Sequence, residues 1–77
     1  MTEVPFPVMS QADPAAVGVL ATWYVRDGEA VGAGQLVAEV QMDKVDLDVT
    51  APTAGTIRLA ASEGDEVTQG SVIAVIE

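Results

Sequence analysis

The only primary amine on a side chain of this sequence belongs to Lys44, in the stretch AEVQMDKVDLDV at residues 38–49. Apolar and acidic residues alternate around it, and Asp43 and Val45 flank it directly. Such an amine can be an ordinary solvated lysine that relieves repulsion between acids. It can equally be the point at which an outside enzyme attaches a prosthetic group. Its position and charge leave both interpretations open.

The sequence lacks the residues on which most other kinds of functional site depend. The chain has no Cys and no His, which removes the usual ligands of zinc and the usual nucleophile and base of triad hydrolases. We therefore expect no metal site and no catalytic residues, so that the domain is not an enzyme by itself.

Size and charge exclude further classes. The 77 residues suffice for one small domain, 1–77, and the formal net charge of −9 with three basic residues argues against nucleic acid as a partner. The N-terminal region lacks a secretory signal, and no apolar run is long enough to span a bilayer. We expect a cytoplasmic protein, monomeric as an isolated domain, without a membrane partner.

The alternation around Lys44 predicts a β-hairpin whose two-residue turn is Asp43-Lys44. Facing pairs are then apolar, Met42–Val45, Val40–Leu47 and Ala38–Val49, or polar, Gln41–Asp46 and Glu39–Asp48. Burial of the apolar face should fix this register, because a slip of one residue turns every side chain to the other face. A lysine at positive φ would be strained, so we expect a type I turn with Lys44 at the tip.

An internal repeat sets the wider architecture. The segment that begins at Gly28 reads like the segment that begins at Gly64, 36 residues later: Gly, acid, any residue, Val, two residues, Gly, then an apolar strand. Upstream, Gly18-Val19-Leu20 corresponds to Gly55-Thr56-Ile57. Two copies are too few for a solenoid and predict two small sheets packed face to face with approximate two-fold symmetry.

The expected elements are strands, since no stretch has a helical period. We place them at residues 3–8, 19–25, 35–42, 45–50, 56–60 and 71–76. Pro5 and Pro7 cannot donate ladder hydrogen bonds, which makes the first an edge strand. Residues 12–17 can form a single turn. The predicted fold is all-β, a flattened barrel or sandwich of two antiparallel sheets.

These motifs together resemble the lipoyl domains of 2-oxo acid dehydrogenase acyltransferases. The resemblance covers residues 18–77 and is carried by DGEAV at 27–31, GQLVAEV at 34–40, DKV at 43–45, APTAG at 51–55 and EGDEV at 63–67 followed by Gly70. It implies a barrel of two sheets with pseudo-two-fold symmetry. It also implies covalent lipoic acid on Lys44, with Asp43 and Val45 as flanking recognition residues.

Related biotinyl domains carry Met on both sides of the modified lysine, where this chain has Asp43 and Val45, so biotin is the alternative cofactor. Two features depart from the lipoyl pattern. Gln41-Met42 replaces the usual Glu-Thr or Glu-Ser, and FPVMSQ at 6–11 stands where the family often reads Met-Pro-x-Leu-Gly-Glu. The segment before Gly18, Met9–Val17, is also about two residues longer than usual. In the family this segment, here called the first loop, contributes to recognition by the dehydrogenase.

The resemblance implies a swinging-arm carrier that shuttles acyl groups and electrons. Its partners would be a lipoate ligase or lipoyl transferase, a thiamine-diphosphate-dependent 2-oxo acid dehydrogenase, an acyltransferase core that passes the acyl group to coenzyme A, and dihydrolipoamide dehydrogenase. The chain would be the N-terminal domain of a longer dihydrolipoamide acyltransferase, with a short free-standing carrier as the alternative. A biotinyl carrier of a biotin-dependent carboxylase and an unmodified binding module with the same fold remain the alternatives.

Three smaller expectations concern the surface. The acids Glu39, Asp46 and Asp48 should point outward, where they are solvated or contact a basic partner. The aromatic residues Phe6, Trp23 and Tyr24 should be packing residues, and Arg26 and Arg58 should form surface ion pairs, each worth under about 1 kcal/mol.

Overall fold

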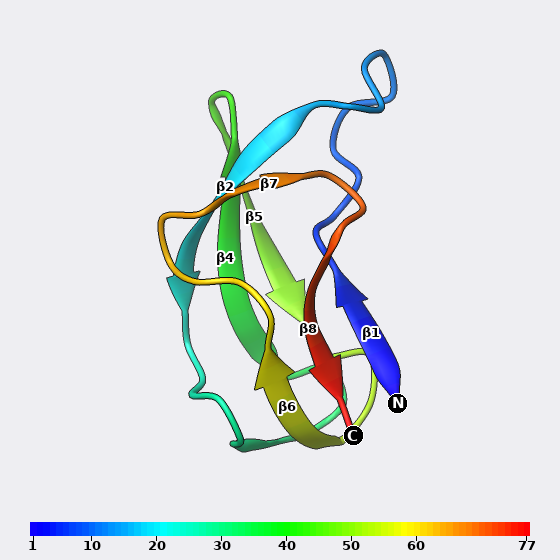
Figure 1. Ribbon diagram of the computed structural model, residues 1–77, viewed down its shortest axis with the longest axis vertical. Coiled ribbons are helices and arrows are strands. Elements are labelled where there is room, and N and C mark those ends of the chain that lie inside the picture. Colours follow the sequence, from blue (N-terminus) through cyan, green and yellow to red (C-terminus); the bar gives the residue numbers. More distant parts are fainter.

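Every regular element of the computed structural model, which describes residues 1–77, is a β-strand. The strands are β1 (Thr2–Pro5), β2 (Val17–Trp23), β3 (Ala30–Val31), β4 (Leu36–Met42), β5 (Val45–Thr50), β6 (Gly55–Leu59), β7 (Glu66–Thr68) and β8 (Val72–Ile76). They form two four-stranded antiparallel sheets with the orders β1-β8-β6-β3 and β5-β4-β2-β7 (Figure 1). The predicted all-β fold of two sheets is confirmed.

The two sheets are pseudo-symmetric copies. In their strand orders β1 corresponds to β5, β8 to β4, β6 to β2 and β3 to β7. The hydrogen bonds obey the same relation: Gly28 N donates to Ile57 O at 2.7 Å, and its counterpart Gly64 N donates to Leu20 O at 2.8 Å. Both glycines have positive φ, 86° and 88°, which side chains rarely adopt. The two-fold relation predicted from the repeat therefore holds.

Six of the eight strands lie where the sequence predicts them, with ends shifted by up to three residues. Strands β3 and β7 were not predicted, because with two and three residues they are too short to show alternation. The first strand ends at Pro5 and pairs only with β8, so it is the edge strand that the prolines predict. Residues 12–17 contain a turn closed by Ala16 N to Asp13 O at 3.0 Å and no helix.

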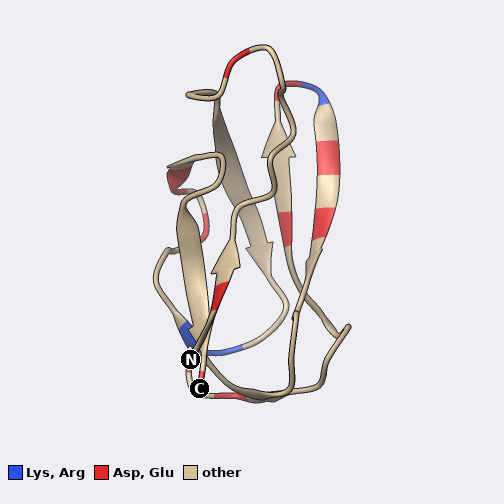
Figure 2. Cartoon of the chain, turned by 90° about the vertical axis from the view of Figure 1, so that its right-hand side faces the viewer, with Lys and Arg blue, Asp and Glu red and all other residues tan.

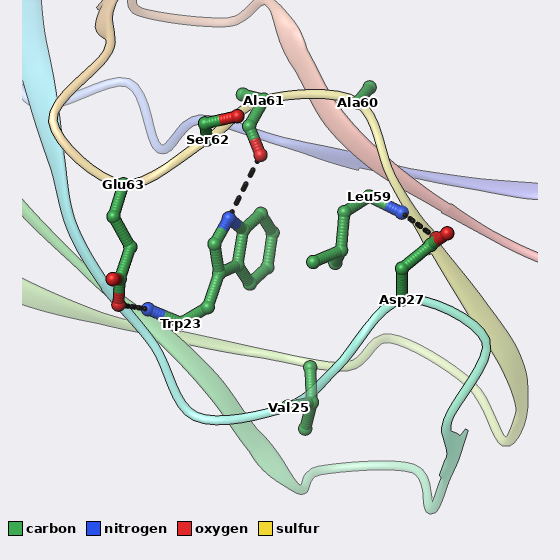
Figure 3. Close-up of a pocket in the computed structure, with 8 residues that line it drawn as sticks. All are labelled: Trp23, Val25, Asp27, Leu59, Ala60, Ala61, Ser62 and Glu63. Carbon is green, nitrogen blue, oxygen red and sulfur yellow. Dashed lines mark hydrogen bonds between the residues drawn. The ribbon is translucent and has the colours of Figure 1, made fainter.

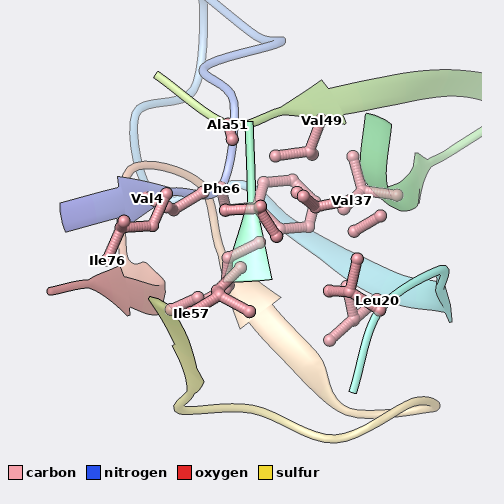
Figure 4. Packing of buried hydrophobic residues seen from close by; sticks show 14 of the residues in the cluster. Val4, Phe6, Leu20, Val37, Val49, Ala51, Ile57 and Ile76 are labelled. Atoms are coloured by element: carbon pink, nitrogen blue, oxygen red, sulfur yellow. The ribbon is translucent and has the colours of Figure 1, made fainter. Parts of the chain in front are cut away.

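A single core of 15 buried hydrophobic residues lies between the sheets (Figure 4). Leu20 and Ile57, equivalent in the repeat, are both fully buried. Phe6 and Ala51 are also equivalent, because each exchanges backbone hydrogen bonds with corresponding residues of the two halves. The larger Phe6 ring makes the core asymmetric, and it reaches β2, where Gly18 leaves room for it.

The molecule is longest, 34 Å, along the direction that separates the β4–β5 turn from the termini. The N- and C-termini lie together at one end, and the β4–β5 turn and the first loop lie at the other (Figure 1). The two-fold relation explains this, because the gap between β8 and β1 is the counterpart of the β4–β5 turn. The structure has no helix, and thus none that could cross a membrane.

Candidate functional site

The hairpin that presents Lys44 has the predicted register. Met42 pairs with Val45, Val40 with Leu47, Ala38 with Val49, Gln41 with Asp46 and Glu39 with Asp48. Lys44 is exposed in the turn, and no carboxylate lies within 4 Å of its amine. Figure 2 shows the basic tip above acidic bands on both strands of the hairpin. An outside enzyme can thus reach the amine.

The turn itself differs from the expectation. Asp43 has a φ of 58°, whereas Lys44 is not among the residues with positive φ. A type I turn requires negative φ at its first central residue, so the type I prediction is wrong. Asp tolerates the left-handed region better than most residues because its short side chain can bond locally. The backbone strain of the turn therefore falls on Asp43, and the lysine remains unstrained.

The faces of the hairpin do not separate as cleanly as the alternation predicts. Met42, Val40, Ala38 and Val49 are buried, but Val45 and Leu47 are 56% and 40% exposed. The exposed part of the apolar face thus lies on β5 alone, because Met42, which precedes the turn on β4, is buried and belongs to the core. Burial therefore fixes the register mainly through β4, with Val49 as the one buried residue of β5.

The opposite face of the hairpin carries the acids. Asp46 and Asp48 are exposed, as expected, whereas Glu39 is half-buried because the Tyr24 hydroxyl donates to its Oε2 at 2.9 Å. This hydrogen bond raises the pKa of Tyr24, and desolvation and the negative charges of Glu39 and Asp48 act in the same direction. Tyr24, itself 49% exposed, is thus a surface hydrogen-bond donor and not the packing residue that was expected.

A groove runs between the tip of the hairpin and the first loop. Its walls are Met9, Ser10, Gln11, Ala12, Asp13, Ala16 and Val17 on one side and Met42, Asp43 and Val45 on the other. Both neighbours of Lys44 in the sequence therefore line it. Any protein that encloses the tip from this side has to contact the first loop as well.

The first loop is held by one side chain that the sequence analysis missed. The Oε1 atom of Gln69 accepts hydrogen bonds from Met9 N and Ser10 N, both at 2.9 Å, and its Nε2 atom donates to Ser10 O and Asp13 O at 2.8 and 2.9 Å. Gln69 is 6% exposed. The signal was present in the repeat, where Gln69 stands opposite Ala33, but a lone mismatch does not reveal its purpose.

A second hollow contains no residue of the hairpin. It is lined by Trp23, Val25, Asp27, Leu59, Ala60, Ala61, Ser62 and Glu63 (Figure 3). Trp23 donates its Nε1 proton to Ala61 O at 3.0 Å and packs against the core. The expectation that Phe6 and Trp23 are packing residues is confirmed. This hollow joins the two halves of the fold and has no part in presenting Lys44.

Of the two arginines, Arg58 forms the expected surface ion pair, with 3.9 Å between its Nε and the Glu77 Oε2. Arg26 has no carboxylate within 4 Å, so that expectation is wrong; only its backbone N–H meets an acid, donating to Glu29 Oε1 at 3.1 Å. No group of three or more metal-ligating side chains occurs. What the site offers chemically is one exposed amine on a defined turn.

The Biotin_lipoyl family model, described as "Biotin-requiring enzyme", matches residues 2–76. The chain is 36% identical over 77 residues to the dihydrolipoyllysine-residue succinyltransferase component of the 2-oxoglutarate dehydrogenase complex of Staphylococcus saprophyticus, covering 99% of this chain and 18% of that protein. It is 38% identical over 76 residues to the dihydrolipoyllysine-residue acetyltransferase component of the pyruvate dehydrogenase complex of Zymomonas mobilis, covering 96% and 17%. The chain thus spans less than a fifth of the length of either relative.

Among solved structures, the fold is similar to the lipoyl domain of the 2-oxoglutarate dehydrogenase complex from Azotobacter vinelandii. The TM-score is 0.75 at 29% sequence identity, and the alignment covers 96% of this chain and 95% of that one. The family model and the relatives cover nearly the whole chain. This protein therefore belongs to the family of biotinyl and lipoyl attachment domains.

Proposed function

We propose that the domain is a lipoyl carrier in which Lys44 bears lipoic acid through an amide bond. The observation that supports this most directly is the position of Lys44, the only lysine, exposed and free of an ion pair at the tip of a two-stranded hairpin. In the amide-forming step the neutral lysine Nζ would attack the carboxyl carbon of the activated lipoate, displace the activating group from that carbon and lose one proton, and the surroundings of Lys44 leave that amine open to an enzyme.

The residues around Lys44 fit such an attachment. Lipoamide, once bound, would supply a disulfide that can be reduced, acylated and reoxidised. The domain contributes no catalytic group: it presents the arm, and the negative φ of Lys44 and the paired strands of the hairpin give the arm a fixed origin. Tethering makes successive encounters intramolecular, at effective concentrations that reach about the millimolar range.

Asp43 and Val45 are proposed as the residues that the attaching enzyme recognises. They flank Lys44, and both are exposed. Asp43 gives the turn its positive φ and adds a negative charge beside the amine, and Val45 offers an uncovered apolar side chain. The alternative biotinyl domains carry Met in these two places, so the attaching enzymes can discriminate by charge and size.

The proposed partners are supported by relatives that are named as acyltransferase components of 2-oxoglutarate and pyruvate dehydrogenase complexes. We propose that residues 1–77 are one domain of such an acyltransferase, in the cytoplasm. A lipoate ligase or lipoyl transferase would load Lys44. The carrier would then serve a thiamine-diphosphate-dependent 2-oxo acid dehydrogenase, the acyltransferase core and dihydrolipoamide dehydrogenase.

Intact mass measurement tests the function. The chain is coexpressed with a lipoate ligase in medium that contains lipoate, and separately with a biotin ligase in medium that contains biotin. We expect a lipoyl increment in the first case, localised to Lys44 by fragmentation of the peptide that contains it. An increment with the biotin ligase alone would instead establish a biotinyl carrier, and no increment with either would leave an unmodified binding module.

The matched control is Lys44→Arg, which keeps the positive charge and removes the primary amine. It should carry no increment. A modification that persisted in Lys44→Arg would place the attachment elsewhere, at the amino terminus, since the chain has no second lysine.

A further inference from the structure

Gln69 is a buried polar side chain whose contacts all lie far away in the sequence. Its amide meets four backbone groups of Met9, Ser10 and Asp13, and its own N–H donates to Ala16 O at 3.0 Å. Both ends of the amide are satisfied, which is what a polar group requires when it is removed from water. Gln69 thus fixes the first loop from one end to the other.

The other half of the domain has no buried glutamine that anchors a loop in this way. The position equivalent to Gln69 is Ala33, which is exposed. The connection between β5 and β6, residues 51–54, is much shorter than its counterpart between β1 and β2, residues 6–16, which contains all of the first loop but Val17. Many backbone hydrogen bonds of one half recur in the other. The longer loop and the glutamine that anchors it are therefore a joint departure from symmetry, at the end of the molecule that bears Lys44 (Figure 1).

The first loop, once fixed, forms one wall of the groove beside Lys44. Gln69 makes no hydrogen bond to the β4–β5 hairpin, which is held by its own strand pairing. Loss of Gln69 would therefore release the loop and leave the lysine turn intact. A mobile loop has to be ordered each time a partner encloses the tip, and this ordering lowers affinity.

We propose that Gln69 is a positioning residue: it holds the first loop as a preformed surface beside Lys44, and through that loop it determines how tightly the dehydrogenase component engages the domain. This inference rests on the proposed lipoyl carrier function. It assigns to Gln69 a role in recognition, beyond its contribution to stability.

The test compares two variants with the wild type, Gln69→Ala and Gln69→Met. Gln69→Met keeps the length of the side chain and removes its hydrogen bonds. The control is Gln35→Ala, which removes a side chain whose one hydrogen bond is accepted from Gly32 N. Gln35 lies at the end of β4 that is remote from the Lys44 turn. All chains are lipoylated and then reductively acylated by the 2-oxoglutarate and pyruvate dehydrogenase components of the same organism, each with its own 2-oxo acid. Hydrogen exchange at the Met9 and Ser10 amides reports on the loop.

We expect complete lipoylation of both Gln69 variants, exchange at Met9 and Ser10 at least about tenfold faster, and KM for the domain about tenfold higher at unchanged kcat. Gln35→Ala should match the wild type in all three. If the wild-type chain accepts no lipoate, or neither dehydrogenase uses it, the proposed function fails. If the wild-type chain is lipoylated and acylated, three results would overturn the inference on Gln69. The Met9 and Ser10 amides of the Gln69 variants could stay as protected as in the wild type, or their exchange could accelerate while KM stays unchanged. The third result is that both Gln69 variants unfold.

Discussion

Asp27 and Glu63 occupy equivalent places in the two halves of the domain, and each accepts a backbone hydrogen bond from the half to which it does not belong. The Oδ1 atom of Asp27 accepts from Leu59 N at 2.9 Å, and the Oε2 atom of Glu63 accepts from Trp23 N at 2.8 Å (Figure 3). The acids before Gly28 and Gly64 thus do more than precede turns. They join the two copies of the repeat across the pseudo-two-fold axis.

Because the two bonds are equivalent, Asp27→Ala and Glu63→Ala should lower the free energy of unfolding by similar amounts, about 1 kcal/mol each. Urea denaturation followed by Trp23 fluorescence measures this. Asp46→Ala is the control, since Asp46 is an exposed acid without a hydrogen bond in the structure, and it should change stability by less than about 0.5 kcal/mol. An equal loss in Asp46→Ala would mean that overall charge, and not the cross-axis bonds, sets stability.

Tyr24 gives a prediction about pH. Its bond to Glu39, together with desolvation and nearby negative charge, raises its pKa above the ordinary value of 10.0. The folded chain therefore keeps the phenolic proton to higher pH than the unfolded chain does. The resulting stabilisation is fully present below about pH 10 and is lost as pH rises through the folded pKa.

The chain has one tyrosine, so ultraviolet absorbance of the phenolate follows Tyr24 alone. Glu39→Gln should lower the midpoint of this titration, because the amide can accept the hydrogen bond but carries no charge. Asp46→Asn should leave the midpoint unchanged, since Asp46 is not among the groups that shift it. A midpoint at the ordinary value in the wild type would contradict the Tyr24–Glu39 contact.

Asp43 combines a backbone role with a proposed recognition role, and substitution separates them. Asp43→Ala places an ordinary residue at a φ of 58° and should destabilise the hairpin by about 1 kcal/mol. Asp43→Asn tolerates this conformation and should stay within about 0.5 kcal/mol of the wild type. If the ligase reads the carboxylate, Asp43→Asn will nevertheless be lipoylated more slowly in initial-rate assays. Equal rates for Asp43→Asn and wild type would limit Asp43 to its role in the turn.

The sequence predicts what depends on local pattern. Alternation from Ala38 to Val49 was enough for the register of the hairpin and for the tip position of Lys44, because one buried face excludes other pairings. The repeat around Gly28 and Gly64 was enough for two related sheets. These features depend on neighbours along the chain and on burial, and both leave a period in the sequence.

What the sequence did not reveal depends on contacts between distant residues. Gln69 meets Met9 and Ser10 across 60 and 59 positions, and no local pattern marks that pairing. Asp27 was noted only as part of the DGEAV motif, because its partner, Leu59, lies in the other half of the sequence. The turn type failed for a different reason: a type I turn was predicted because a lysine at positive φ would be strained, whereas Asp43 takes the positive φ in place of Lys44.

The asymmetric core gives the last prediction, which concerns the close approach of β2 to Phe6. A Cβ atom on Gly18 would collide with the Phe6 ring and lie 2.8 Å from Gln41 O on the neighbouring strand β4. Phe6 is fully buried, and the Gln41 oxygen belongs to the backbone and cannot rotate away, so neither group can move aside without a substantial energetic cost. Gly18→Ala should therefore lower the free energy of unfolding by about 1–3 kcal/mol, the range for overpacked cores.

Gly32→Ala is its matched control, because φ at Gly32 is not positive and the nearest atom to an added Cβ is the mobile Gln35 Oε1 at 4.0 Å. In chemical denaturation, the free energy of unfolding of Gly32→Ala should be close to that of the wild type, and that of Gly18→Ala should be clearly lower. Since Gly18 pairs with Val67 and its neighbour Val19 pairs with Gln41, the distortion would spread toward the first loop and the hairpin. Similar stability of the two variants would show that Phe6 is not packed against β2 in the manner described.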